Sequence, residues 1–240
     1  MVSLKEKLEF LEDGIDFPFY NDIPKLSTAE WLLLLAPVII MLAMLFVPDL
    51  RPGEYSPIII FLIMVIPALY VCKGNYSLFF KKPKKRDILT IILCVIASYV
   101  YTLTVAYILM FVLRIPISGN AILSEFTSPD VFLIISTLMQ LLGEEFFKIF
   151  MLLILMHVVY KLTSNRGLSI ALGLILTLFI FGIAHSRAYS GRILQILLIQ
   201  GLGSIFDVYA YMKTKNVVVS YIIHVLIDFI SFGATMIQSM

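Results

Sequence analysis

Seven long apolar runs are the feature that most limits how this chain can fold. They lie near residues 30–48, 57–72, 88–113, 131–160, 168–186, 193–212 and 217–237. A helix that crosses the hydrocarbon core of a bilayer needs about 20 apolar residues, and most of these runs reach that length. The pattern therefore predicts an all-α fold, a polytopic transmembrane bundle of about seven (six to eight) spanning helices. Helix ends read from sequence are fixed only to within several residues.

The composition excludes a soluble protein. Hydrophobic residues make up 60% of the 240 residues, charged residues 14%, and the mean hydropathy is +0.99. A soluble domain carries about 25% charged residues, so this chain has too few charges to cover a surface that faces water. We expect a lipid bilayer around it and no nucleic acid as a partner. Cys72 and Cys94 lie inside apolar runs, which predicts free thiols.

The first 29 residues form the only sizeable polar segment. Ser3 and Glu6 have the spacing of a capping box and are followed by leucines at helical intervals, which predicts a short amphipathic helix on the membrane surface. We divide the chain into this N-terminal segment, 1–29, and an integral membrane domain, 30–240. Residues 130–235 of that domain carry the motifs described below.

Loop charges predict the orientation. Counted along seven alternating spans, most loop lysines and arginines fall on the side of the N-terminus, and the segment Phe79–Arg86 contributes five of them. Cytoplasmic loops carry the excess of positive charge, so the N-terminus is predicted to be cytoplasmic. We interpret the basic loop as a topology signal. The short loops and small size favour a prokaryotic plasma membrane.

Ionisable residues inside the apolar runs gather in the second half of the chain. Each costs roughly 2.5–3.5 kcal/mol in a lipid-facing helix, so such residues usually face the protein interior and mark function. The fourth run carries Glu144 and Glu145, and Lys148 lies four and three residues later, within reach of either. One glutamate would be neutralised by Lys148 and the other left as a base or metal ligand. A purely structural Glu–Lys pair is the alternative.

Two histidines and an aspartate join this set. His185 ends the fifth run, while His224 and Asp228 lie one helical turn apart on the same face of the seventh. Alone, each is compatible with an interfacial or structural role. Together with the glutamates they can activate a water, with a glutamate as general base and a histidine polarising the substrate or donating to the developing oxyanion.

The same residues can instead hold a divalent metal such as zinc that keeps a position open for water. Its ligands would be Glu145, His185 and His224. The sequence leaves these two chemistries open. Asp207, a further charge in the sixth run, is expected to bond within the bundle or to line the cavity.

One feature opposes convergence of these residues. If all helix ends were level, the rise of about 1.5 Å per residue would place His185 and His224 at depths that differ by roughly 15 Å. A shared site therefore requires displaced helix ends, a tilted fifth helix or a re-entrant segment before it.

At these positions the chain resembles the CAAX protease and bacteriocin-processing family, called CPBP or Abi, which includes the type 2 CAAX prenyl proteases. The family pattern is Glu-Glu-x-x-x-Arg, Phe-x-x-x-His and His-x-x-x-Asn/Asp, each on its own transmembrane helix. Phe181 to His185 fits the second motif and His224 to Asp228 fits the third.

The first motif departs from the pattern. Both glutamates are present, but the basic residue is Lys148, one position early, and Ile149 stands where arginine is expected. Lysine lacks the two-pronged hydrogen-bonding geometry of arginine. The departure therefore concerns the role of Lys148 more than that of the glutamates.

The resemblance implies an intramembrane endopeptidase acting on a membrane-associated peptide or protein, such as a CAAX-like, bacteriocin or signal-peptide precursor. It further implies that Glu144 or Glu145 with His185 activates water, while His224 with Asp228 stabilises the oxyanion or completes the site. Family members are described both as metal-dependent and as glutamate-based, so the resemblance leaves the cofactor open.

Two other functions stay open. A non-catalytic relative would act as a membrane interaction, regulatory or bacteriocin-immunity protein, and the shifted Lys148 favours it. A transporter would use the carboxylates as a proton relay. The last run has no lysine for a Schiff base, which argues against a retinal-binding receptor.

Overall fold

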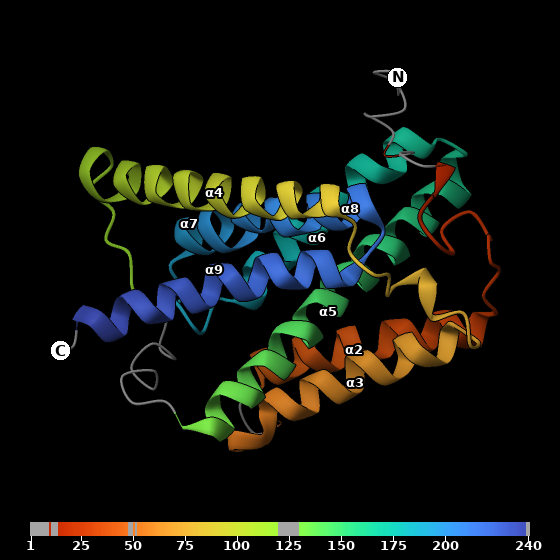
Figure 1. Cartoon of the computed structure of the whole chain (residues 1–240), viewed down its shortest axis with the longest axis horizontal. Coiled ribbons are helices and arrows are strands. Elements are labelled where there is room, and N and C mark those ends of the chain that lie inside the picture. The colour runs from red at the N-terminus through yellow and green to blue at the C-terminus, as the bar shows by residue number, and fades with distance from the viewer. Residues whose placement is uncertain (1–9, 11–13, 48–49, 51, 120–129, 239–240) are drawn as a thin grey trace.

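The computed structural model describes residues 10, 14–47, 50, 52–119 and 130–238. Its helices, drawn in Figure 1, are α2 (Thr28–Phe46), α3 (Ser56–Val71), α4 (Lys85–Tyr107), α5 (Val131–Thr163), α6 (Arg166–Ala184), α7 (Ile193–Gln195), α8 (Ile205–Thr214) and α9 (Val217–Gln238). A π-helical turn, Ile108–Val112, extends α4. A π-helical turn, Ile196–Gly201, and a 3-10 turn, Leu202–Ser204, join α7 to α8 in one segment.

The predicted all-α polytopic fold is confirmed over the described residues. Five helical segments are long and apolar enough to cross a membrane, and two shorter apolar helices accompany them. These seven elements correspond to the seven predicted runs. A capping box begins α2, because Ser27 and Glu30 bond each other's backbone N–H. The amphipathic helix predicted around Ser3 and Glu6 lies outside the described residues.

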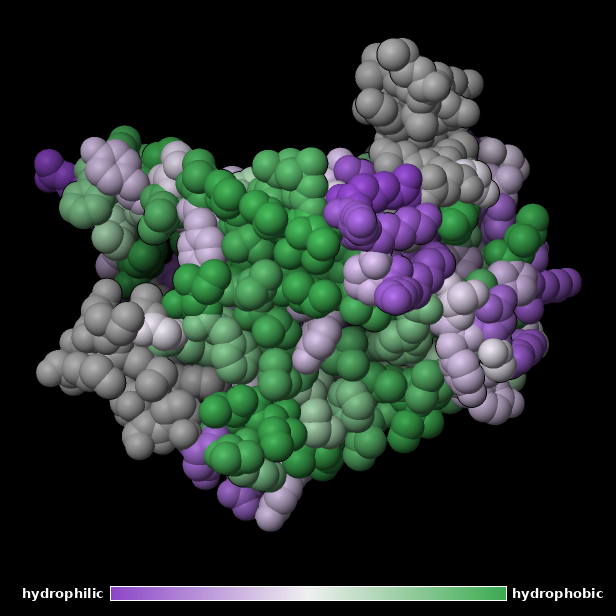
Figure 2. Space-filling model, in the orientation of Figure 1, coloured by the Kyte–Doolittle hydropathy of each residue, from purple (hydrophilic) through white to green (hydrophobic). Residues whose placement is uncertain are grey.

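Helix α5 lies at the centre of the bundle. It packs against α2, α3, α6 and α9, while α4 packs against α8 and α9 (Figure 1). Both cysteines are buried and free, as predicted. The outer faces are apolar, with side chains such as Ile92, Leu103 and Ile175 half exposed or more. Figure 2 shows this apolar belt across the molecule with hydrophilic residues toward its ends. A surface of this kind fits a bilayer, and the chain is an integral membrane protein.

The described part of the N-terminal segment packs into the bundle. Phe17, Phe19 and Tyr20 are buried at 0–1% exposure. The Tyr20 hydroxyl donates to Asp16, which also accepts a 2.6 Å bond from Arg166 at the start of α6. The aromatic segment therefore closes one end of the bundle.

The helix ends are not level, which resolves the depth problem. The Val217 N–H at the start of α9 donates to the Phe79 carbonyl at 2.9 Å. The Phe79 ring lies 5.5 Å from the Phe146 ring, between their centroids, in the middle of α5. Helix α9 therefore begins beside the middle of α5, which continues to Thr163. The roughly 15 Å mismatch between His185 and His224 arose from assuming level ends, and that assumption was wrong.

Two glycines bring the backbone of α6 against the π-helical turn Ile196–Gly201. A Cβ added to Gly182 would lie 2.7 Å from the Ile196 carbonyl oxygen and 3.0 Å from the Gly201 Cα. Backbone atoms cannot move aside as a flexible side chain can. Glycine is thus required at this position, and the contact holds the C-terminal end of α6, where His185 lies.

We predict that Gly182→Ala destabilises the protein by about 1–3 kcal/mol, the usual cost of an overpacked contact. The measurement is the thermal midpoint of the detergent-purified protein. Gly167→Ala on the same helix is the control, because its Cβ would come no closer than 3.6 Å to a neighbouring atom. A Gly182→Ala midpoint equal to that of wild type would show that the close contact does not constrain the helices.

Candidate active site

The structure brings together the five side chains that the sequence singled out as catalytic. Glu144 and Glu145 come from the buried centre of α5, His185 from the end of α6, and His224 and Asp228 from α9. The Nε2 atoms of both histidines lie 3.9 Å from the same atom, Oε2 of Glu144. Oδ2 of Asp228 lies 3.9 Å from His224 Nε2.

Hydrogen bonds orient both imidazole rings. His185 Nδ1 lies 2.9 Å from the Phe181 carbonyl oxygen, which can only accept, so Nδ1 carries the proton. His224 Nδ1 lies 2.8 Å from Oε1 of Glu145. When neutral, each ring therefore directs the lone pair of Nε2 toward Glu144. Phe181 of the second motif thus fixes its histidine through its backbone carbonyl, and its ring also contacts the imidazole.

Lys148 pairs with Glu145 rather than Glu144. Its Nζ lies 2.5 Å from Oε1 of Glu145 and also contacts Oδ2 of Asp207 on α8, and all three side chains are at most 4% exposed. Asp207, expected either to bond within the bundle or to line the cavity, bonds within the bundle. The ammonium therefore neutralises a buried carboxylate on each of two helices from its shifted position.

Sequence reasoning missed Gln140. Its Nε2 donates a 2.7 Å hydrogen bond to Oε1 of Glu144. The sequence did contain an indication of this contact, because Gln140 is a polar residue in an apolar run and lies one helical turn before Glu144. Because this bond occupies Oε1, the other oxygen of Glu144 faces the two imidazoles.

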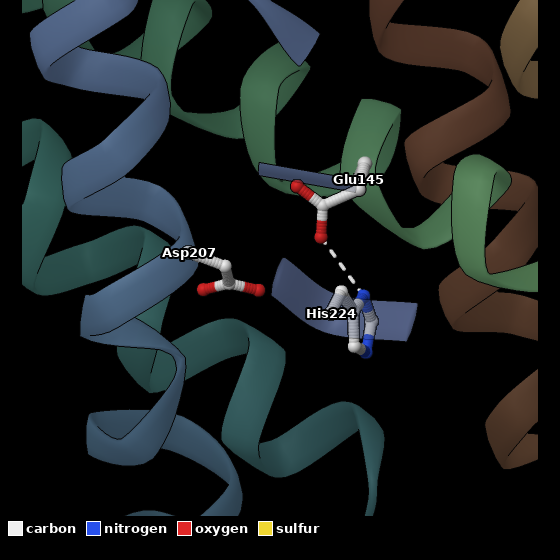
Figure 3. Close-up of side chains that lie close together, drawn as sticks. All are labelled: Glu145, Asp207 and His224. Atoms are coloured by element: carbon white, nitrogen blue, oxygen red, sulfur yellow. Dashed lines mark hydrogen bonds and ion pairs between the residues drawn. The ribbon is translucent and has the colours of Figure 1, made fainter. Parts of the chain in front are cut away.

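One group of three potential metal ligands already contacts the ammonium group of Lys148. Donor atoms of Glu145, Asp207 and His224 lie within 4.8 Å of one another (Figure 3). The Lys148 ammonium contacts both carboxylates, so a metal ion there would have to displace a buried positive charge. This set therefore fits a metal poorly.

Glu144 with the two Nε2 atoms is a second candidate set. Zinc–ligand distances of about 2.0–2.2 Å in tetrahedral geometry imply ligand atoms about 3.3–3.6 Å apart. Each Nε2 lies 3.9 Å from Oε2 of Glu144, but the three donor atoms do not all lie within 4.8 Å of one another, so a metal would have to draw the two imidazoles together. Both Nδ1 atoms bond to oxygen acceptors, as in most metal-ligating histidines. This set differs from the predicted one in having Glu144 in place of Glu145.

The site carries a surplus of negative charge. It contains one lysine, which contacts Glu145 and Asp207, and two further carboxylates, those of Glu144 and Asp228, lie 3.9 Å from His224. Uncompensated charge is costly to bury. Protonation of an imidazole or a carboxylate, or a bound divalent cation, would reduce this cost.

The side chains on one side of the site are buried, and those on the other side are partly exposed. The Glu145 and Lys148 side chains are 2% and 1% exposed, whereas His185 and Asp228 are 21% and 32% exposed. The more exposed side chains of the site therefore lie on the His185 and Asp228 side of Glu144. The buried side holds the charges that fix the ring of His224.

A comparison with protein families gives a match that covers the candidate site. Residues 127–230 match the family described as "Type II CAAX prenyl endopeptidase Rce1-like", and this region contains all five converging side chains. No curated protein and no solved structure matches the chain significantly. Residues 127–230 are therefore similar to the Rce1-like family of type II CAAX prenyl endopeptidases, and this similarity supports a CAAX-type intramembrane protease at the level of the family.

Proposed function

We propose that this protein is an active intramembrane endopeptidase in which Glu144 and His185 activate the attacking water. The observation that carries the proposal is the approach of two imidazole Nε2 atoms to a single carboxylate oxygen, at 3.9 Å each. A water between two such atoms would hydrogen-bond to both, because each bond needs about 2.7–3.0 Å and the path may bend. Glu144 is thus positioned as the general base.

The remaining side chains have distinct parts in the proposed hydrolysis. The water attacks the scissile carbonyl carbon as Glu144 takes its proton, and Gln140 holds the other oxygen of that carboxylate. His224, doubly protonated between Glu145 and Asp228, donates through Nε2 to the oxyanion. When the C–N bond breaks, Glu144 returns the proton to the leaving amine. Lys148 and Asp207 keep Glu145 in place beneath His224.

A divalent cation is compatible with this proposal. Glu144, His185 and His224 would hold it, and the negative charge of the site favours its binding. Such an ion polarises a carbonyl group and makes a bound water more acidic. In that case Gln140 and Glu145 would still orient Glu144 and His224.

We further propose that the substrate is a membrane-associated peptide or protein. A CAAX-like precursor is favoured by the family description, and bacteriocin or signal-peptide precursors are the other candidates. The exposed apolar faces suit a bilayer around the protein, which supports a substrate that is itself associated with the membrane. Access from the His185 and Asp228 side would let an extended segment reach Glu144.

Substituting His185 tests the proposed function. Cells that express wild type or His185→Ala at equal membrane protein levels are compared by mapping the ends of peptides in their membranes and medium. Fragments that wild type produces should disappear in His185→Ala. His157→Ala is the matched control, because His157 lies elsewhere on α5, bonded to the Tyr20 carbonyl and stacked on Trp31.

Persistence of all fragments in His185→Ala would contradict catalysis. If the cellular phenotype also persisted, the non-catalytic binding function would be favoured. Proton flux through proteoliposomes without any peptide would instead favour the transporter.

A further inference from the structure

A basic cleft lies outside the candidate active site, between the α3–α4 connection and the α8–α9 turn. The cleft is shallow, and its volume of about 360 Å³ includes space that is open to the solvent. Six lining residues are basic and one, Asp87, is acidic; the basic ones are Lys81, Lys82, Lys84, Arg86, Lys213 and Lys215. The two walls come from parts of the chain about 130 residues apart.

Hydrogen bonds fix the two walls to each other. The side chain of Asn216, which is 2% exposed, accepts from the Lys81 N–H at 3.0 Å and donates to the Lys81 carbonyl at 2.9 Å. The Lys81 ammonium donates to the Lys215 carbonyl at 2.7 Å. These hydrogen bonds therefore fix the positions of the two basic segments relative to each other.

A topology signal does not explain this arrangement. The positive-inside rule depends on the number of lysines and arginines in a loop, and it does not require two connections to converge on one cleft. Convergence is also costly, because burial and the neighbouring charge of Lys84 lower the pKa of Lys81. Asp87 is the single acidic residue among those that line the cleft. Its carboxylate lies 4.0 Å from Nε of Arg86 and also caps α4 by accepting from the Lys84 N–H at 2.7 Å.

We propose that this cleft binds the phosphate group of an anionic membrane lipid. The cationic groups of Lys82, Lys84, Arg86 and Lys213 suit a phosphate, which offers several charged acceptor oxygens. The ammonium of Lys215 is buried instead, where it contacts the Phe10 carbonyl and the Phe17 ring. The cleft lies where α4 and α9 begin, and Figure 2 shows hydrophilic residues beside the apolar belt where α4 starts. A lipid with its chains along the belt would bring its headgroup to this level.

The test measures lipid retention by the full-length protein with native mass spectrometry. Phosphatidylglycerol and phosphatidylcholine of equal chain length are added to detergent-purified wild type, to Lys82→Gln/Lys213→Gln and to Lys25→Gln/Lys85→Gln. The first variant removes one charge from each wall. The second removes two exposed lysines that do not line the cleft, so the change in net charge is the same.

Wild type should retain phosphatidylglycerol in preference to phosphatidylcholine. The apparent affinity for phosphatidylglycerol should fall about tenfold or more in the cleft variant and less than twofold in the control, because lysines near an anionic surface contribute strongly and locally. Displacement by millimolar inorganic phosphate would show that the phosphate group itself is recognised. Equal losses in both variants, or equal retention of both lipids, would overturn the proposal.

Discussion

Glu144→Gln is expected to lower kcat by about 10²–10⁴-fold, the usual contribution of general acid–base catalysis, and to leave the fold intact. Glutamine keeps the size of the side chain and can still hydrogen-bond, but it cannot take a proton from water. The change also removes one of the four carboxylates of a site that contains one lysine, so the thermal midpoint should not fall. KM should change little, because Glu144 is proposed to act on the water.

The measurement uses purified protein in proteoliposomes and a substrate identified by the fragment mapping. Glu54→Gln is the control, since it makes the same chemical change in an exposed turn. A Glu144→Gln enzyme with kcat within threefold of wild type would remove Glu144 from the reaction. The water would then need another base, and Glu145 is already bonded to Lys148 and His224.

Lys148→Met is expected to destabilise the protein by about 3–5 kcal/mol. It removes the cation between Glu145 and Asp207, and leaving a buried charge without its partner has a cost of this size. Methionine retains most of the side-chain volume, so the effect would come from charge rather than from a cavity. Thermal midpoint and the yield of folded protein from detergent are the measurements.

A double variant keeps this prediction testable if Lys148→Met fails to fold. Lys148→Met/Asp207→Asn removes one of the two stranded charges and should recover part of the lost stability, which would reveal coupling between α5 and α8. Lys148→Arg should fold, because it keeps the charge. Full stability of Lys148→Met would mean that the buried ammonium is not what holds these carboxylates.

The lysine network also bears on the departure from the family motif. The shifted position alone favoured a non-catalytic relative. In the structure, Lys148 contacts both Glu145 and Asp207, and Glu145 holds His224 in place. The shift therefore leaves the orientation of the histidine intact, and Asp207 supplies a second anchor that the motif does not include.

The sequence by itself determined the fold class and the identity of the converging residues. Within a bilayer, every backbone polar group must be satisfied inside its own segment or a closed barrel, so apolar runs of this length can only be helices. Local geometry also determined that His224 and Asp228 share a face and that Lys148 reaches a neighbouring glutamate. These features depend on one helix at a time.

Only the tertiary structure decided how the helices lie relative to one another. It placed Glu144, rather than Glu145, between the two imidazoles, gave Lys148 its partner Asp207, and set the start of α9 beside the middle of α5. The physical reason is that axial position in a helix bundle is set by packing between helices. Contacts such as Gly182 against Gly201 depend on two segments together, and no pattern within one segment encodes them.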